Sequence, residues 1–194
     1  FSDEAGAPLQ PLADQLATAI TYADLFQRVR DDATRRTLIN EVTQAAASSL
    51  DISELLERAA EAIASQLEMP CVIFQWDDET DSLIPLSVRN QMGADVTPVE
   101  MPRFTRQMDP ALFQAIRTRQ LQVLFNVVSS VEGAAAQLAQ QLDLVDAAYM
   151  PLVSRDQPLG VLALGRQRGH PALDEGQLSF LEVVAANLGV ALEN

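Results

Sequence analysis

The side chains that most often perform chemistry in proteins are scarce in this chain. Its 194 residues include one cysteine and one histidine, and all thirteen basic residues are arginines. The lack of lysine excludes a P-loop lysine and Schiff-base chemistry. One cysteine and one histidine cannot build a four-ligand zinc site or an intrachain disulfide. We therefore expect a non-catalytic protein without bound zinc, and the single thiol suits a cytoplasmic location.

The lone cysteine and the lone histidine each have two interpretations. Cys71 begins an apolar run, where it is either a reactive thiol or a small buried residue with a raised pKa. His170 lies between Gly169 and Pro171, where it is either a haem ligand or general base, or a solvated loop residue. We favour the structural interpretation of both residues and expect no haem.

A second set of residues is suited to binding rather than to catalysis. Aromatic side chains can form the apolar walls of a ligand cavity, and arginine or asparagine can fix a polar group of the ligand. The alternative is that the aromatic residues are ordinary core and the arginines are solvated surface. The candidate pocket residues are Trp76, Arg89, Arg103, Phe104, Phe113, Phe125, Asn126 and Tyr149.

Strand and helix patterns that would position these residues follow one another along the second part of the chain. Apolar runs predict strands at residues 71–76, 83–88 and 121–125, and two more runs around the polar cluster 154–158 predict a β-hairpin. Composition and spacing predict helices at residues 52–68, 111–117, 132–142 and 173–193. Sheets of this kind with one helix-covered face indicate an α+β architecture.

The first part of the chain has a different pattern. Residues 12–69 contain neither glycine nor proline, and apolar residues recur there every three or four positions in two registers. We therefore divide the chain into an N-terminal helical connector or coiled-coil segment, residues 1–50, and a domain, residues 51–194. The stripes predict a homodimer through the N- and C-terminal helices, with packing back onto the domain as the alternative. The predicted seam residues are Leu12, Leu16, Phe26, Leu38, Val42, Leu56, Leu181 and Leu188.

The charge of the chain limits its partners. The formal net charge is -14, whereas nucleic acids and anionic membrane surfaces require a basic face. No apolar run reaches the roughly 18 residues of a membrane-spanning helix. We expect no nucleic-acid binding and no direct membrane contact. The start without methionine suggests a fragment of a larger protein, and whether that protein is membrane-anchored stays open.

Three local patterns resemble GAF domains, which are sensory modules of signalling proteins. Residues 55–63 resemble the opening helix of the family, and residues 113–126 resemble its helix-to-strand step. The strongest resemblance is the pair of apolar runs from Met150 to Leu164. The order of elements over residues 51–194 is similar to the whole domain. The sequence departs from the pattern at Arg119 and Gln120, where many members place a glycine-containing turn.

The resemblance implies an antiparallel sheet with the terminal helices on one face and a small-molecule pocket on the other, roofed by residues 91–145. It implies a sensory or regulatory role in a sensor kinase of a two-component system, a cyclase or a transcription regulator. The best-known chemistries of relatives are not expected. Bilin-binding members carry a cysteine near the pocket helices, methionine-sulfoxide-reducing members need several cysteines, and the cyclic-nucleotide signature requires a lysine. A structural dimerisation module with a self-filled pocket is the alternative.

Overall fold

The computed structural model describes residue 40, residues 52–96 and residues 101–193. The chain divides into two units, Phe1–Leu38 and Ile39–Asn194, and the fold below belongs to the second unit. Five of the predicted seam residues lie outside the described residues. They are Leu12, Leu16, Phe26, Leu38 and Val42.

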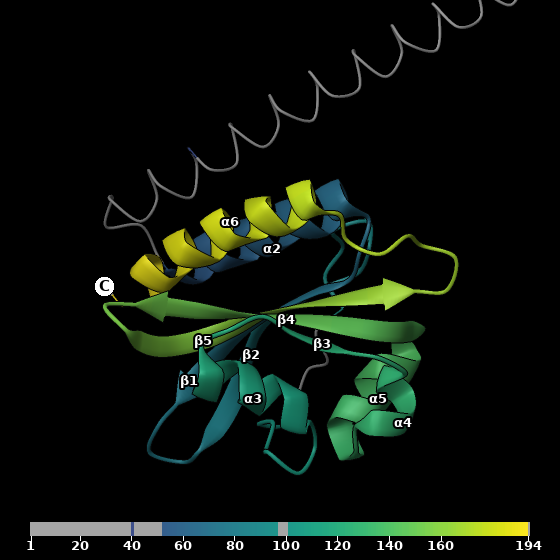
Figure 1. Ribbon diagram of the computed structural model, residues 1–194, viewed down its shortest axis with the longest axis horizontal. Coiled ribbons are helices and arrows are strands. Elements are labelled where there is room, and N and C mark those ends of the chain that lie inside the picture. The colour runs from purple at the N-terminus through teal and green to yellow at the C-terminus, as the bar shows by residue number, and fades with distance from the viewer. Residues whose placement is uncertain (1–39, 41–51, 97–100, 194) are drawn as a thin grey trace, which may run out of the picture. The chain divides into compact units, whose positions relative to one another are not determined.

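An antiparallel sheet of five strands forms the centre of the domain, in the order β2-β1-β5-β4-β3 (Figure 1). The strands are β1 (Cys71–Asp77), β2 (Ser82–Arg89), β3 (Gln122–Leu124), β4 (Leu144–Ser154) and β5 (Gln157–Gln167). The β4–β5 hairpin closes through Arg155 and Asp156, whose φ angles of 46° and 65° match the turn that two-residue hairpins require. The predicted strands and the predicted hairpin are confirmed.

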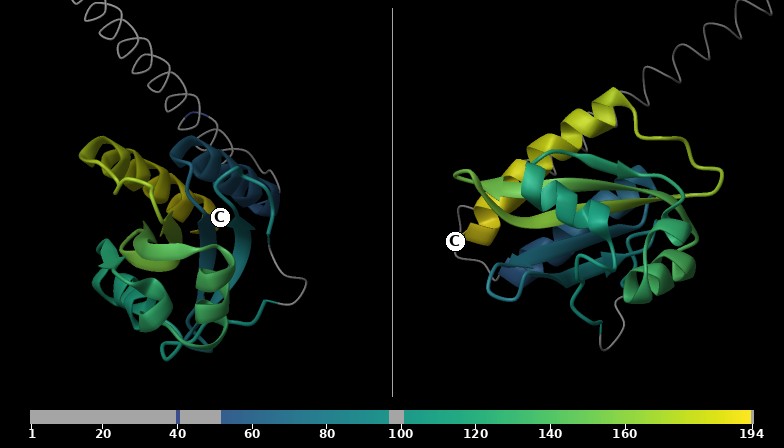
Figure 2. Two further views of the ribbon diagram at one scale, coloured as in Figure 1. Left: turned by 90° about the vertical axis from the view of Figure 1, so that its right-hand side faces the viewer. Right: turned by 60° about the horizontal axis from the view of Figure 1, so that its bottom comes forward.

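Helices cover both faces of the sheet (Figures 1 and 2). Two long helices, α2 (Ile52–Leu67) and α6 (Glu175–Glu193), lie on one face. Three shorter helices, α3 (Pro110–Thr118), α4 (Val127–Ser130) and α5 (Gly133–Gln141), lie on the other. This arrangement confirms the predicted α+β fold with the terminal helices together on one face.

The alternation of side chains along the strands divides the core between these two faces. Residues at every second position share one apolar cluster with the α3–α5 layer, and they include Val72 and Phe74 of β1, Ala147 and Tyr149 of β4, and Val161 and Ala163 of β5. The intervening residues, such as the fully buried Ile73 and Leu162, therefore face α2 and α6. A single strand thus contacts both helical layers.

The described part of the predicted dimer seam is corrected by the structure. Leu56, Leu181 and Leu188 are 2%, 1% and 0% exposed within one copy of the domain. They hold α2 and α6 against the sheet, so they are not available to a second copy. An apolar stripe on a helix can pack against a sheet as well as against a partner helix.

Capping residues define where α6 and α3 begin. The backbone N–H of Gln177 donates to Asp174 Oδ1 at 2.7 Å, and Gln177 Oε1 accepts from the backbone N–H of Asp174 at 2.9 Å. This reciprocal pair is a capping box, which fixes the start of α6. Asp109 caps α3 by accepting from the backbone N–H of Leu112 at 3.0 Å.

Arg119 ends α3 in the left-handed conformation, with φ 56° and ψ 32°. This is the position where the sequence lacks the glycine of related domains, and its side chain is exposed. A residue with a Cβ is strained in this conformation, whereas glycine is not. We expect Arg119→Gly to raise the free energy of unfolding by about 0.5–1 kcal/mol, measured by urea denaturation. Arg119→Ala removes the same side chain but keeps the strain, so an equal gain in both variants would contradict this explanation.

Candidate ligand cavity

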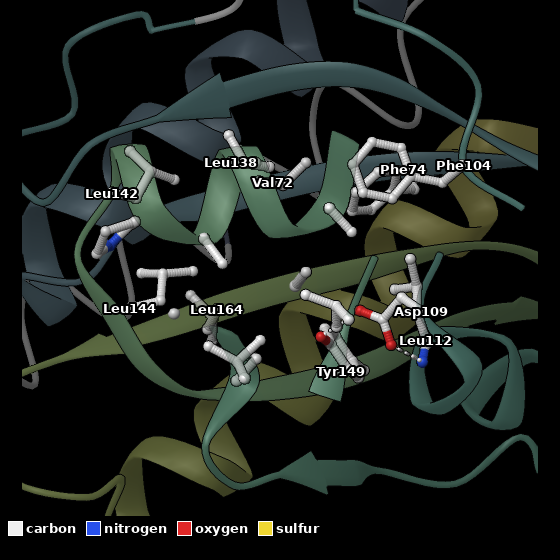
Figure 3. A pocket seen from close by; sticks show the side chains of 18 residues that line it. Val72, Phe74, Phe104, Asp109, Leu112, Leu138, Leu142, Leu144, Tyr149 and Leu164 are labelled. Atoms are coloured by element: carbon white, nitrogen blue, oxygen red, sulfur yellow. Dashed lines mark hydrogen bonds between the residues drawn. The ribbon is translucent and has the colours of Figure 1, made fainter. Parts of the chain in front are cut away.

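A cavity of about 50 Å³ lies between the sheet and the α3–α5 layer (Figure 3). Side chains of three strands form its floor: Val72, Phe74, Ala147, Tyr149 and Ala163. The helices and the segments beside them supply the opposite wall, including Phe104, Leu112, Val127, Leu138 and Leu142. The site is therefore formed by the face of the sheet opposite the two long helices.

Small side chains leave the space that forms the cavity. Four of its lining residues are alanines, Ala135 and Ala139 on α5 and Ala147 and Ala163 on the sheet. A methyl group reaches only a short way from the backbone, so the two layers cannot fill the gap between them. The sequence of α5, GAAAQLAQQ, combines this small face with a lack of charged residues.

Two polar side chains reach this otherwise apolar lining. Asp109 and Tyr149 turn their oxygen atoms toward each other (Figure 3), and the Tyr149 hydroxyl donates to Asp109 Oδ2 at 2.5 Å. Asp109 is 3% exposed and Tyr149 is 4% exposed. Burial raises the pKa of the Asp109 carboxyl, although hydrogen bonds from Tyr149 and from backbone N–H groups oppose that rise. Burial and the adjacent Asp109 carboxylate also raise the pKa of Tyr149, which keeps the phenol protonated.

The residues with reactive side chains lie away from this cavity. Cys71 precedes the cavity residue Val72 on β1, so its side chain points to the opposite face of the sheet. Burial raises the pKa of its thiol to about 12, which leaves little nucleophilic thiolate at neutral pH. His170 is half-buried and lies in the segment between β5 and α6, where its carbonyl accepts from Arg166 Nη1 at 3.1 Å. Neither residue lines the cavity.

The described residues contain neither a cluster of metal ligands nor a helix suited to a bilayer. Among these residues, no group of three or more histidine, cysteine, aspartate or glutamate side chains is placed to hold a metal ion. In the same part of the chain, no helix combines the length and apolar character needed to cross a bilayer.

The structure brings two of the eight candidate pocket residues, Phe104 and Tyr149, to the cavity. Trp76 and Phe113 pack on each other instead, with ring centroids 5.8 Å apart and an interplanar angle of 80°. Phe113 is buried in the same apolar cluster as the cavity lining, and Trp76 lies at its edge. These two aromatic side chains support the wall of the cavity without contacting its space.

The two candidate arginines are held by carboxylates outside the cavity. Arg89 is buried on the α2 side of the sheet, where its guanidinium lies 3.0 Å from Asp95 and 3.8 Å from Glu57 of α2. Arg103 pairs with Asp77 at the tip of the β1–β2 hairpin, and this pairing lowers the pKa of that carboxyl. Both arginines are therefore structural in this arrangement.

Phe125 and Asn126 lie at the end of β3, outside the cavity lining. The Phe125 ring is 66% exposed. Asn126 precedes α4 in the left-handed conformation, with φ 51°, and its backbone N–H donates to Asp146 Oδ1 at 3.1 Å. These contacts anchor the start of the short helix that helps to roof the cavity.

Asp109 and three residues of α5 line the cavity, although none of them is among the pocket residues predicted from the sequence. Asp109 caps α3 through its own neighbours, but its contact with Tyr149 joins residues 40 positions apart. No local sequence pattern predicts a contact between residues so far apart in the chain. The alanine spacing in residues 132–142 was the available signal for the wall, because an alanine-rich helix packed on a sheet leaves room.

A larger hollow of about 210 Å³ lies beside the first turn of α2 and the last turn of α6. Its lining includes Ser53, Glu57 and Gln75, and all three are exposed. The smaller cavity is instead lined almost wholly by buried side chains, among which are a buried carboxyl and a buried phenol. The smaller cavity is therefore the candidate site.

An antiparallel sheet with two long helices on one face and a helix-roofed cavity on the other defines a class of small α+β domains. The sequence model of the GAF domain family matches residues 49–193. The chain belongs to the GAF domain family, whose members are generally sensory or regulatory modules of signalling proteins. A search among curated proteins finds no sequence match.

Solved structures share this fold. The GAF domain of a phosphoenolpyruvate-protein phosphotransferase from Coxiella burnetii aligns with a TM-score of 0.63 and 14% identity, over 83% of this chain and 94% of that one. Free methionine-R-sulfoxide reductase from Neisseria meningitidis aligns with a TM-score of 0.62 and 17% identity, over 82% and 88%. Residues 122 to 287 of a methyl-accepting chemotaxis protein align with a TM-score of 0.61 and 16% identity, over 78% and 94%. At these identities the likeness is one of fold.

Proposed function

We propose that this GAF domain is a non-catalytic sensory domain of a larger cytoplasmic signalling protein, such as a sensor kinase, a cyclase or a transcription regulator. A small molecule binds in the cavity between the sheet and the α3–α5 layer and changes the packing of the domain. The observation that carries the proposal is an apolar cavity lined by buried side chains, with two buried polar groups at its wall, the usual composition of a ligand site.

The roof of the cavity is suited to move when a ligand enters. A cavity of about 50 Å³ is smaller than the roughly 150 Å³ that accommodates benzene in a protein core. Most metabolites therefore require the roof to shift outward. The backbone N–H of Glu132 donates to the Met108 carbonyl at 2.8 Å before α5, and Gln167 Nε2 donates to the Leu142 carbonyl at 2.8 Å after it. The uncharged helix between these contacts can move without breaking an ion pair of its own.

The same strands that floor the cavity also contact the long helices. Tyr149 faces the cavity, and the next residue, Met150, is buried on the side of α6. Further along β4, the backbone of Val153 lies against Gly189 of α6. A shift of β4 caused by a ligand would therefore reach α6 directly, which gives a route from the cavity to an output module.

Filling the cavity tests the proposal. Ala163→Val adds two methyl groups at the cavity floor on a central strand, where valine is favoured. We expect the variant to gain about 0.5–1 kcal/mol of unfolding free energy, because buried methyl groups replace empty space. We also expect it to lose the thermal stabilisation that wild-type protein gains from active compounds in a panel of metabolites and nucleotides.

Ala172→Val serves as the control, because it makes the same substitution at an exposed position between β5 and α6. It should bind as wild type does. A compound that stabilises Ala163→Val and wild type equally binds outside the cavity, and a panel without any stabilising compound would oppose a sensory role.

The small volume of the cavity favours one alternative, a structural dimerisation module with a self-filled pocket. In that case the exposed face of α6 associates with a second copy. Val183 is 43% exposed there, and the exposed Ala186 follows one turn later. The buried leucines of the predicted seam are replaced in this proposal by residues of the opposite helix face.

A single charge on this face tests the dimer. We expect Val183→Asp to convert dimers to monomers in light scattering, because a buried unpaired carboxylate at an interface weakens association at least tenfold. Val123→Asp is the matched control, since Val123 is 50% exposed on β3 and lies on an element remote in sequence from α6. Dimers that survive Val183→Asp but not Val123→Asp would locate the interface elsewhere.

A further inference from the structure

The charge balance around Asp109 indicates what kind of ligand the cavity takes. Two aspartates are buried in the described part of the chain, Asp109 and Asp146. Asp146 receives two hydrogen bonds from the guanidinium of Arg166, which lower the pKa of its carboxyl. Among the described residues, Asp109 has no ion pair with an arginine. Asp109 is the more deeply buried of the two, at 3% exposed against 9% for Asp146, yet the charge of Asp109 has no cationic partner within the described structure.

The arginines nearest to Asp109 in the sequence are turned to other partners. Arg103 pairs with Asp77, and Arg106 Nη2 lies 3.3 Å from Asp81 Oδ1. The Arg106 guanidinium also lies 6.0 Å from the centre of the Phe113 ring. No residue that lines the cavity carries a positive charge, and the other polar side chain of the lining is that of Tyr149.

Neutral groups compensate only part of this charge. Asp109 Oδ1 accepts from the first turn of α3 and Oδ2 accepts from Tyr149, and the helix N-terminus favours a carboxylate. A carboxylate has about four acceptor positions, so positions remain for a ligand. The pKa of Asp109 is nevertheless raised, because burial outweighs these contacts. A ligand cation would supply the attraction that the protein lacks.

We propose that the cavity binds a small apolar amine in its ammonium form, with the N–H groups on Asp109 and the carbon chain against the apolar walls. This inference rests on the proposed function as a ligand-binding domain. The rings of Phe74 and Phe104 line the same cavity, with centroids 5.0 Å apart, and aromatic faces also attract ammonium groups. The same lining disfavours phosphate, nucleotide and carboxylate ligands, since no cation is present among the lining residues to receive them.

The size of the cavity sets the probes. We choose n-propylammonium chloride, with 1-propanol as the neutral analogue of similar shape and sodium propionate as the anionic one, all at the same ionic strength. A ligand of four heavy atoms binds no more tightly than about 40 µM, so titrations reach the millimolar range. Thermal stabilisation of the intact chain then gives a Kd for each probe. We expect the amine to bind about tenfold more tightly than the alcohol, and propionate not to bind.

Asp109→Asn tests whether the charge of the Asp109 side chain, and not its shape, determines amine binding. The asparagine can still cap α3 and contact Tyr149, but it carries no charge. We expect its affinity for n-propylammonium to fall to that of 1-propanol. Asp156→Asn is the matched control, because it removes one negative charge at the exposed β4–β5 turn and leaves the cavity unchanged. Amine affinity that falls equally in both variants would reflect the overall acidity of the domain and would overturn the proposal.

The pH dependence of amine affinity is a second test, and it uses the wild-type protein, so it does not require Asp109→Asn to fold. Tyr149 of β4 is the titratable group in contact with Asp109, and Arg103 and Arg106 of the adjoining segment face Asp77 and Asp81. Tyr149 stays neutral and the amine stays charged, so amine affinity should be lost as the pH falls and Asp109 takes up a proton. Alcohol affinity should not change. Amine affinity that is constant across the titration of Asp109 would contradict the proposal.

The outcomes separate this inference from the proposed function. If 1-propanol binds as tightly as the amine and both are lost in Ala163→Val, the cavity is a ligand site but the ligand class is wrong. If no probe and no panel compound stabilises the wild-type protein, both proposals fail. If the amine binds Asp109→Asn as it binds wild type, the role of Asp109 is refuted.

Discussion

Gly189→Ala is expected to lower the free energy of unfolding by about 3 kcal/mol, a large effect for the addition of one methyl group. Gly189 lies in α6 where the helix crosses β4. A Cβ at this position would lie 2.5 Å from the carbonyl oxygen of Val153 and 2.8 Å from its carbonyl carbon. These are backbone atoms, so no side-chain rotation relieves the overlap and α6 must move away from the sheet. Urea denaturation of the two proteins measures the loss.

Gly176→Ala is the matched control in the same helix. Gly176 is exposed in the first turn of α6, where alanine has the higher helix propensity. That variant should be more stable by up to about 1 kcal/mol. The same substitution is thus expected to have opposite signs at the two positions. If Gly189→Ala were also stabilising, the close approach of α6 to β4, and with it the proposed route from the cavity to α6, would be contradicted.

Asp109→Ala is expected to cost about 2 kcal/mol of unfolding free energy. The substitution removes the cap of α3, which contributes about 1 kcal/mol. It also leaves the buried Tyr149 hydroxyl without its acceptor, which costs a further 1–3 kcal/mol. Relief from burying a carboxylate offsets part of this loss. Asp109→Asn keeps both hydrogen-bonding groups and should remain within about 1 kcal/mol of wild type at pH 4.

The stability of wild type relative to Asp109→Asn should fall as the pH rises. Burial raises the pKa of Asp109 in the folded domain, so the folded state binds this proton more tightly than the unfolded chain does. The resulting stability is fully present below the unfolded pKa of about 4 and is lost as the pH rises through the folded pKa. Urea denaturation of both proteins across this range measures the difference. A difference that grows with pH would mean that the Asp109 carboxylate is well compensated in the fold.

Most of the fold could be predicted from the sequence because its signals are local. The strand periodicity around Val72 and Phe74, the polar cluster at residues 154–158 and the capping pair of Asp174 and Gln177 each depend on neighbours a few residues apart. The family resemblance supplied the arrangement of these elements. The left-handed end of α3 at Arg119 was visible only as a missing glycine, since arginine is not a typical residue there.

The faces of the helices were harder to predict. Leu56, Leu181 and Leu188 recur at helical spacing, and that spacing says which side of a helix is apolar but not what covers it. The sheet covers these leucines. A prediction of the dimer surface required the opposite faces of the helices, where Val183 and Val190 are exposed among polar and small residues.

The cavity itself depends on contacts that sequence spacing does not contain. Large aromatic residues were natural candidates for its walls, yet Trp76 and Phe113 pack on each other and Phe125 is exposed. The space arises where side chains are small, as at Ala139 and Ala163. A cavity forms where small side chains on two facing elements leave space between them. Which elements face each other must therefore be known before the cavity can be predicted.

Methyl NMR of the intact chain tests the central claim, that a ligand occupies the cavity between the sheet and the α3–α5 layer. The protein is titrated with the compound that stabilises it most, and the methyl groups of Leu138, Leu142 and Ala163 are followed. We expect these signals to shift in proportion to occupancy, while the exposed methyl groups of Val123 do not. Saturable shifts that are confined to Val183 and the outer face of α6, with none at the cavity, would contradict the account.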